Sequence, residues 1–153
     1  FTDQLRPFEA DEAVKRINCV TAGHGVVAPC FFVQTEVPGY LNYCSEGWRL
    51  EQNLLVKKSE LFLRKTAGDS FFRTELQNKL KSLEISDLVI CGYASDFALK
   101  YYRRATGLGY TVLLVSDAHT THDKEHLSAE KEYCWYLSVE VDDALALSAY
   151  IEI

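Results

Sequence analysis

The chain has 153 residues, of which 48% are hydrophobic and 25% are charged, and its formal net charge at pH 7 is -6. This length suits one domain with a sizeable core and is too short for two, so we expect a single domain over residues 1–153. An acidic chain without a basic stripe is a poor candidate for nucleic-acid binding, because phosphate contacts need clustered Lys and Arg.

The cysteines and the lengths of the apolar segments indicate the cellular compartment of the protein. Five cysteines occur without regular spacing, which argues against a disulfide framework and for a reducing compartment. No apolar run approaches the length of a membrane span, and no signal-peptide pattern precedes the domain. We therefore expect a cytoplasmic protein with no membrane partner.

The first half of the chain predicts a helix, a strand and a long loop. Residues 9–23 alternate charged with apolar side chains, which indicates an amphipathic helix ended by Gly23 or Gly25. Residues 26–33 read as a strand interrupted by Pro29. Residues 34–53 predict a loop, and loops of that length in a small domain are often functional.

The second half predicts alternating strands and helices. Residues 61–65 form a short strand and residues 74–83 an amphipathic helix. Residues 88–91 are an apolar run closed by Gly92, typical of a buried strand. A helix follows, with Ser95 or Asp96 as its N-cap, and residues 110–115 are a second apolar strand. Residues 127–139 mix a helical face with aromatic residues, and the apolar ending, residues 144–153, matches no element securely.

The helix over residues 95–106 is indicated by Leu99, Tyr102 and Thr106, which recur at i, i+3 and i+7, and it is ended by Gly107 and Gly109. Strand, helix and strand in about thirty residues make a βαβ crossover, which implies a parallel sheet covered by helices and an α/β fold. Ligands of such sheets bind beyond the carboxyl ends of the strands. We therefore expect the turns at residues 92–97 and 116–121 to face one site.

Four short motifs around these two strands are similar to a known signature. The chain resembles the isochorismatase-like cysteine hydrolases at Gly92-Tyr93-Ala94-Ser95-Asp96-Phe97, Arg103-Arg104-Ala105, Gly109-Tyr110 and Ser116-Asp117-Ala118. The resemblance implies a three-layer (α/β/α) Rossmann-like fold with a six-stranded, mainly parallel sheet. It also implies a small-molecule substrate and a homo-oligomer, either a dimer or a tetramer.

The resemblance assigns roles to residues from separate parts of the chain. Residues 1–8 look like the end of the family's first strand, which makes Asp3 the general base and acid. Residues 65–76 resemble the family's lysine motif, which makes Lys65 the residue that stabilises the thiolate. The peptide bond between Tyr93 and Ala94 would be cis, with backbone N–H groups directed at the oxyanion.

The expected nucleophile is the conspicuous departure from the family pattern. A cysteine should follow Phe97, and the sequence has Ala98 there. The chain also contains no methionine, and Asp3 precedes Gln4 where the family has a methionine between them. We interpret these three anomalies as residues omitted from the sequence, a cysteine after Phe97 and a methionine after Asp3. A deliberate Cys-to-Ala change and a naturally inactive homologue are the alternatives.

Aromatic residues and other cysteines complete the set of candidates. Phe8, Trp48, Phe71 and Tyr93 are candidates for the wall of the substrate pocket, with ordinary core packing as an equal interpretation for Phe8 and Phe71. Cys91 lies inside a strand, so we expect a buried core thiol that cannot replace the missing nucleophile.

We expect no metal and no cofactor. The metal-binding nicotinamidase branch of the family has Asp-x-His before a proline, and residues 35–38 of this chain offer neither ligand. His119, His122 and His126 lie near Asp123, but the pair His119 and His122 is spaced i, i+3, which is not the usual i, i+4 zinc geometry. We therefore favour exposed turn histidines over a metal site.

The sequence thus predicts a cysteine hydrolase that cleaves a small amide, or a related C–N or ether bond, through an Asp-Lys-Cys triad. The competing class is a catalytically inactive member of the family that binds a small molecule or serves assembly. A generic nucleotide-binding protein is disfavoured, because Gly107-Leu108-Gly109 follows a helix, whereas a phosphate-binding glycine turn opens one.

Overall fold

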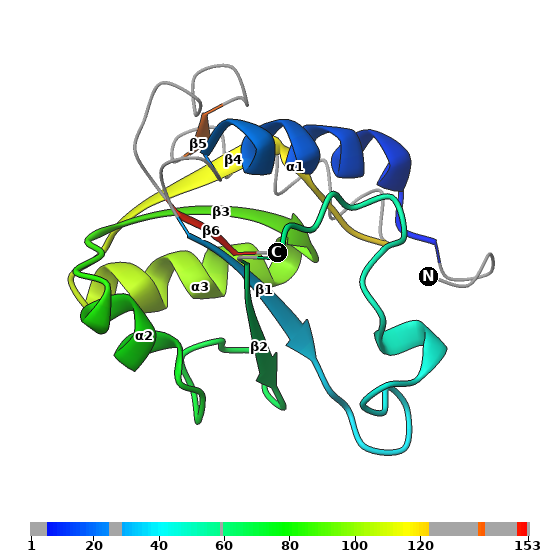
Figure 1. The fold of residues 1–153 in the computed structure, drawn as a ribbon, viewed down its shortest axis with the longest axis horizontal. Helices are drawn as coiled ribbons and strands as arrows, with labels where there is room; N and C mark the ends of the chain where they lie inside the picture. The colour runs from blue at the N-terminus through cyan, green and yellow to red at the C-terminus, as the bar shows by residue number, and fades with distance from the viewer. Residues whose placement is uncertain (1–5, 25–28, 59, 123–137, 140–149, 153) are drawn as a thin grey trace.

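The computed structural model describes residues 6–24, 29–58, 60–122, 138–139 and 150–152. Its centre is a six-stranded sheet in the order β2-β1-β6-β3-β4-β5, and each neighbouring pair is parallel (Figure 1). The strands are β1 (Cys30–Thr35), β2 (Leu61–Lys65), β3 (Asp87–Tyr93), β4 (Thr111–Thr120), β5 (Ser138–Val139) and β6 (Tyr150–Glu152). The predicted parallel α/β sheet is confirmed.

Helices cover both faces of this sheet. The helix α1 (Ala10–His24) lies on one face, and α2 (Leu76–Ser82) and α3 (Ser95–Gly107) lie on the other (Figure 1). A short 3-10 helix, η1 (Glu46–Trp48), sits in the loop after β1. The expected three-layer arrangement is therefore present.

The two cores follow from the alternation of side chains along buried parallel strands. In β3, Val89 packs toward α1 with Ile17 and Val20, whereas Leu88 packs toward α2 and α3 with Leu80 and other core residues. Both faces are apolar, which explains why the strand reads as a continuous hydrophobic run. Cys91 is 3% exposed in this strand, as predicted.

The buried face of α3 does not coincide with the residues that recur at helical spacing in the sequence. Tyr101 and Ala105 are buried, Tyr102 is only partly buried, and Thr106 is exposed, while the side chain of Leu99 lies outside the described part. Apolar spacing alone could not separate adjacent faces, because Tyr101 and Tyr102 are equally apolar and only contact with the sheet chooses between them.

The start of α3 also differs from the prediction. The helix begins at Ser95 with Ala94 as its N-cap, so neither Ser95 nor Asp96 is the cap. Ala94 has no side-chain oxygen that could accept a hydrogen bond from the first turn, so residue type gave no signal for this position.

The strand β4 is longer than predicted, since it continues past Val115 to Thr120. Its pairing with β3 is regular as far as Ile90 opposite Leu114 and resumes at Gly92 opposite His119. Four residues of β4 therefore lie opposite a single residue of β3. This irregularity brings the end of β4 beside the turn that leads into α3.

Candidate active site

The carboxyl ends of four strands meet around one cavity of about 510 Å3. Thr35 of β1, Lys65 of β2, Tyr93 of β3 and Thr120 of β4 all line it. Parallel strands end at the same edge of a sheet, which explains why residues distant in sequence meet here. The two turns expected to face one site both contribute residues to this cavity.

Lys65 is the last residue of β2 and is only 7% exposed. Its Nζ donates a hydrogen bond to the Ser70 hydroxyl over 2.9 Å and lies 4.1 Å from the centre of the Tyr101 ring. A lysine held in this way places a positive charge at a fixed position, with the ring face adding a cation–π contact. Such a charge can stabilise a thiolate or a developing oxyanion.

The turn between β3 and α3 has the geometry that the resemblance implies. The Tyr93–Ala94 peptide bond is cis, and Gly92 has a φ of 124°, which favours glycine. The turn leads directly into the N-terminus of α3, where backbone N–H groups and the helix dipole favour negative charge. Ala98 lies in the first turn of that helix.

His119 lies within β4 and is partly buried, so the prediction of an exposed turn histidine is wrong for this residue. Its Nε2 is 2.9 Å from the carbonyl oxygen of Ile90, and because a carbonyl only accepts, Nε2 carries the proton. Burial lowers the pKa of His119 to about 4, against the opposing effects of backbone hydrogen bonds to Ile90 and Gly92 and of Asp117. The ring also borders a smaller cavity of about 30 Å3 shared with Lys65. The signal in the sequence is its place shortly after the strand predicted at residues 110–115.

Other predicted site residues fall in different places. Trp48 lines the large cavity, and its carbonyl accepts a 2.9 Å hydrogen bond from Gln34 Nε2.

Phe71 does not border the cavity; it is 7% exposed in the core and stacks on Tyr110. Phe8 is not a lining residue either, and its carbonyl accepts a hydrogen bond from the Thr120 hydroxyl. Asp3 lies outside the described residues.

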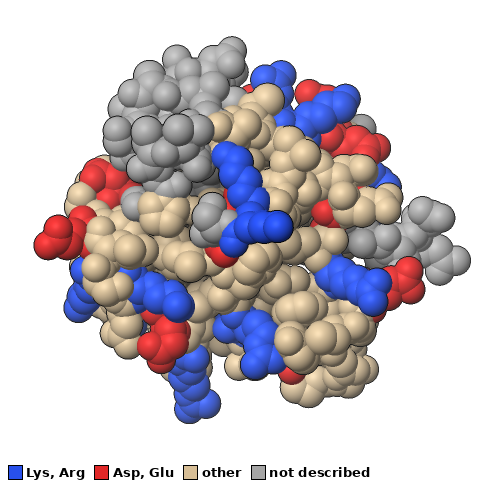
Figure 2. All heavy atoms as spheres, viewed as in Figure 1, with Lys and Arg blue, Asp and Glu red and all other residues tan. Residues whose placement is uncertain are grey.

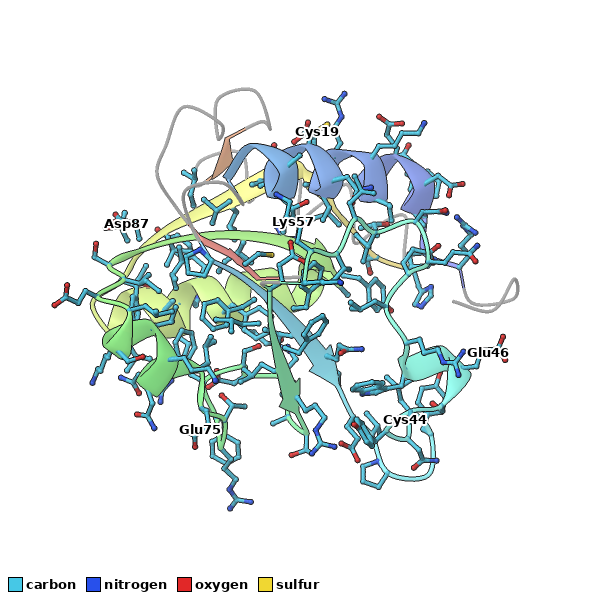
Figure 3. The ribbon with its side chains drawn as sticks, viewed as in Figure 1. Cys19, Cys44, Glu46, Lys57, Glu75 and Asp87 are labelled. Atoms are coloured by element: carbon cyan, nitrogen blue, oxygen red, sulfur yellow. The ribbon has the colours of Figure 1, made fainter. Side chains whose placement is uncertain are left out.

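The described cysteines offer no exposed thiol at the turn. Cys91 borders the smaller cavity but is 3% exposed within β3, and burial raises the pKa of the Cys30 thiol to about 12. Cys19 on α1 and Cys44 in the loop after β1 are exposed (Figure 3). Neither exposed cysteine lines a cavity described above.

The histidines do not assemble a metal site in the part of the chain that the structure describes. His122 is exposed and meets the Tyr93 ring edge-on at 5.1 Å between centroids, and His126 lies outside the described residues. Within those residues, no three His, Cys, Asp or Glu side chains are grouped closely enough to hold a metal ion.

Comparison with known proteins identifies the family. Residues 4–134 match the Isochorismatase domain. The chain belongs to the isochorismatase family. It is therefore a member of a family of hydrolases with an α/β fold.

Two relatives show how far the likeness in sequence extends. The chain is 35% identical to streptothricin hydrolase of Streptomyces noursei over 50% of this chain and 28% of the relative. It is 30% identical to the uncharacterized isochorismatase family protein YddQ of Bacillus subtilis over 61% of this chain and 55% of the relative. The matches thus span only part of these relatives' lengths.

A solved structure shows the likeness in fold. It is a cysteine hydrolase from Pseudomonas syringae, which superposes with a TM-score of 0.84 at 13% identity, over 95% of this chain and 84% of that one. At this identity, the likeness shows the shared fold alone.

Proposed function

We propose that this isochorismatase-family chain is a metal-independent cysteine hydrolase that cleaves a small amide through a thioester. One observation carries the proposal: Lys65 and the Tyr93–Ala94 turn at the start of α3 border the same cavity. A buried cation beside a helix N-terminus is the environment that lowers a thiol pKa.

The proposed reaction uses three residues. Asp3 takes the proton from a cysteine at or just before Ala98, and the thiolate attacks the amide carbonyl. A C–S bond forms, the C–N bond breaks, and Asp3 returns the proton to the departing amine. Water then hydrolyses the thioester and restores the thiol. Lys65 stabilises the thiolate, and backbone N–H groups of the turn at Tyr93 and Ala94 stabilise the oxyanion.

A second candidate function is a non-catalytic binding protein. It is favoured by Ala98 in the nucleophile position and by the lack of an exposed thiol lining the cavity among the described residues. Such a protein would keep the cavity and lose acyl transfer. The two candidates differ in whether a cysteine stands between Phe97 and the rest of α3.

The deciding experiment combines peptide mass spectrometry with alkylation. We expect the protein to contain a cysteine after Phe97 and a methionine after Asp3, and that cysteine should react with iodoacetamide at neutral pH faster than an unfolded peptide control. Lys65→Ala should slow this reaction, since the thiol pKa rises without the ammonium. Asp3→Asn should lower turnover by about 10²–10⁴-fold through loss of proton transfer.

Two controls make the result specific. Lys58→Ala removes an exposed lysine and should leave the fast thiol unchanged, while Cys19 and Cys44 report the rate of ordinary exposed thiols. If Phe97 is bonded directly to Ala98, or if Lys65→Ala leaves the fast thiol unaffected, the hydrolase proposal is wrong. A direct Phe97–Ala98 bond would leave the binding protein as the conclusion.

A further inference from the structure

Beyond the strand ends, most of the residues that line the large cavity are apolar. One side is the inner face of α1, which contributes aliphatic side chains, and the other is the loop after β1, which contributes aliphatic and aromatic ones. The residues are Ala10, Ala13, Val14 and Ile17 on α1, and Leu41, Trp48, Leu50 and Leu54 in the loop. A ligand seated between these walls would exchange water for hydrocarbon over most of its surface.

Hydrogen bonds hold the loop wall against the rest of the fold. Asn18 on α1 donates from Nδ2 to the Asn53 carbonyl over 2.9 Å and accepts from the Leu55 N–H at Oδ1 over 2.8 Å. The side-chain amide of Gln34, on β1, donates a hydrogen bond to the backbone carbonyl of Trp48. Figure 1 shows the loop leaving β1, passing through η1 and returning alongside α1. The wall is therefore fixed before a ligand arrives, which lowers the entropic cost of binding.

Charge in the lining is sparse and nearly balanced. Among the described lining residues, Lys65, Arg49 and Glu51 are the charged ones. Lys65 stands at the strand ends, where the reacting group would lie, whereas Arg49 and Glu51 both belong to the loop and have opposite charges. The part of a ligand that contacts α1 and the loop thus meets no net charge.

We infer that this site selects a small amide whose non-reacting part is an uncharged ring or branched alkyl group. The amide lies at Lys65 and the Tyr93–Ala94 turn, and the apolar group packs between α1 and the loop carrying Trp48. The inference rests on the proposed function only in taking the polar end of the ligand to be an amide. The selection itself comes from the wall, so it holds whether or not the site carries a nucleophile.

The test measures binding, without requiring turnover, in a Trp135→Phe background where Trp48 is the remaining tryptophan. Fluorescence is read within the first seconds of mixing. Phenylacetamide and isovaleramide should bind at least tenfold more tightly than acetamide. Butyramide should bind more tightly than succinamate, which has a similar chain ending in a carboxylate. Equal affinity of phenylacetamide and acetamide, or tighter binding of succinamate, would overturn the inference.

Variants on α1 locate the effect. Ala13→Leu fills the cavity and should weaken phenylacetamide tenfold or more while leaving acetamide unchanged. The matched control is Cys19→Leu on the exposed side of the same helix (Figure 3), which should leave both affinities unchanged. If Ala13→Leu does not fold, Leu54→Ala replaces it and should weaken phenylacetamide several-fold. The inference is wrong if the variant that folds binds both amides as the parent protein does.

The outcomes separate this inference from the hydrolase proposal. Apolar selectivity without a reactive cysteine would leave a binding protein with the site described here. A reactive, Lys65-dependent cysteine without apolar selectivity would keep the hydrolase and remove only the substrate class.

Discussion

At the scale of single residues, the site contrasts a buried cation with a neutral imidazole. Lys65 is held by Ser70 and the Tyr101 ring, so its charge is positioned by contacts on two sides. His119 instead donates to the Ile90 carbonyl where the pairing of β3 with β4 is interrupted. This side-chain hydrogen bond stands where a backbone hydrogen bond between β3 and β4 would otherwise lie, just before the turn that begins α3. One residue thus supplies charge, and the other supports the backbone beside it.

The lowered pKa of His119 predicts a pH-dependent stability. Its pKa falls from 6.5 to about 4 on folding, chiefly through burial. The unfolded chain binds the proton more readily, so the contribution is complete above pH 6.5 and is lost as the pH falls toward 4. At pH 4.5 the loss should be about 3 kcal/mol, at roughly 1.4 kcal/mol for each pH unit below 6.5.

Urea unfolding at pH 7 and pH 4.5 measures this loss. His119→Gln can still donate to the Ile90 carbonyl and does not titrate, so it should lose less stability than the parent protein between these pH values. Carboxylates titrate in both proteins, so their contributions to the loss of stability cancel when the two losses are compared. An equal loss in both would show that His119 does not contribute.

At the scale of elements, α1 serves both the core and the cavity. Ile17 packs against the sheet and also lines the cavity, and Asn18 beside it holds the loop after β1. The helix therefore couples the stability of one sheet face to the shape of the site. The loop has few buried residues of its own, so its position depends on such hydrogen bonds.

Asn18→Ala should release the loop. Removing both hydrogen bonds should cost about 1–2 kcal/mol locally, at about 1 kcal/mol for each bond. The Leu55 amide, which donates to Asn18 Oδ1, should then exchange with deuterium about tenfold faster. Lys15→Ala, at an exposed position on the same helix, should leave that exchange rate unchanged. Unchanged exchange in Asn18→Ala would mean that other contacts hold the loop.

At the scale of the whole molecule, two apolar layers flank one sheet and the surface is mixed in charge. On the face shown in Figure 2, Lys and Arg lie among Asp and Glu and do not form a single stripe. Across the described ranges, no helix is both long and apolar enough to cross a membrane. The two buried clusters that hold the helices to the sheet are expected to supply most of the stability of the fold, because they bury most of its apolar side chains.

Two leucines of the α2 region test this dependence. Leu80 is 1% exposed in the core, whereas Leu83, at the C-cap of the same helix, is 46% exposed. Leu80→Ala should lower the free energy of unfolding by about 2–5 kcal/mol through lost burial and a cavity. Leu83→Ala should change it by less than about 1 kcal/mol. Denaturant unfolding compares them, and equal losses would contradict the assigned packing of α2.

Local sequence pattern determined much of the fold. The short strand at residues 61–65 matches β2, and the predicted helix at residues 9–23 is shifted by only one residue from α1. The βαβ crossover predicted the parallel pairing of β3 with β4. These predictions succeed because apolar periodicity, glycine stops and crossover geometry are properties of the chain itself.

Tertiary structure decided the rest. A three-residue strand carries no periodic signal, so nothing in residues 150–152 predicts a place in the sheet, yet β6 lies between β1 and β3. Phe71 and Trp48 are both large aromatic residues, and only the packing of their elements puts one in the core and the other on the cavity wall. The same holds for His119, whose bond to Ile90 depends on where the pairing of β3 with β4 is interrupted. Residue type and spacing limit which groups can meet at the strand ends, but contacts between distant segments decide which groups do.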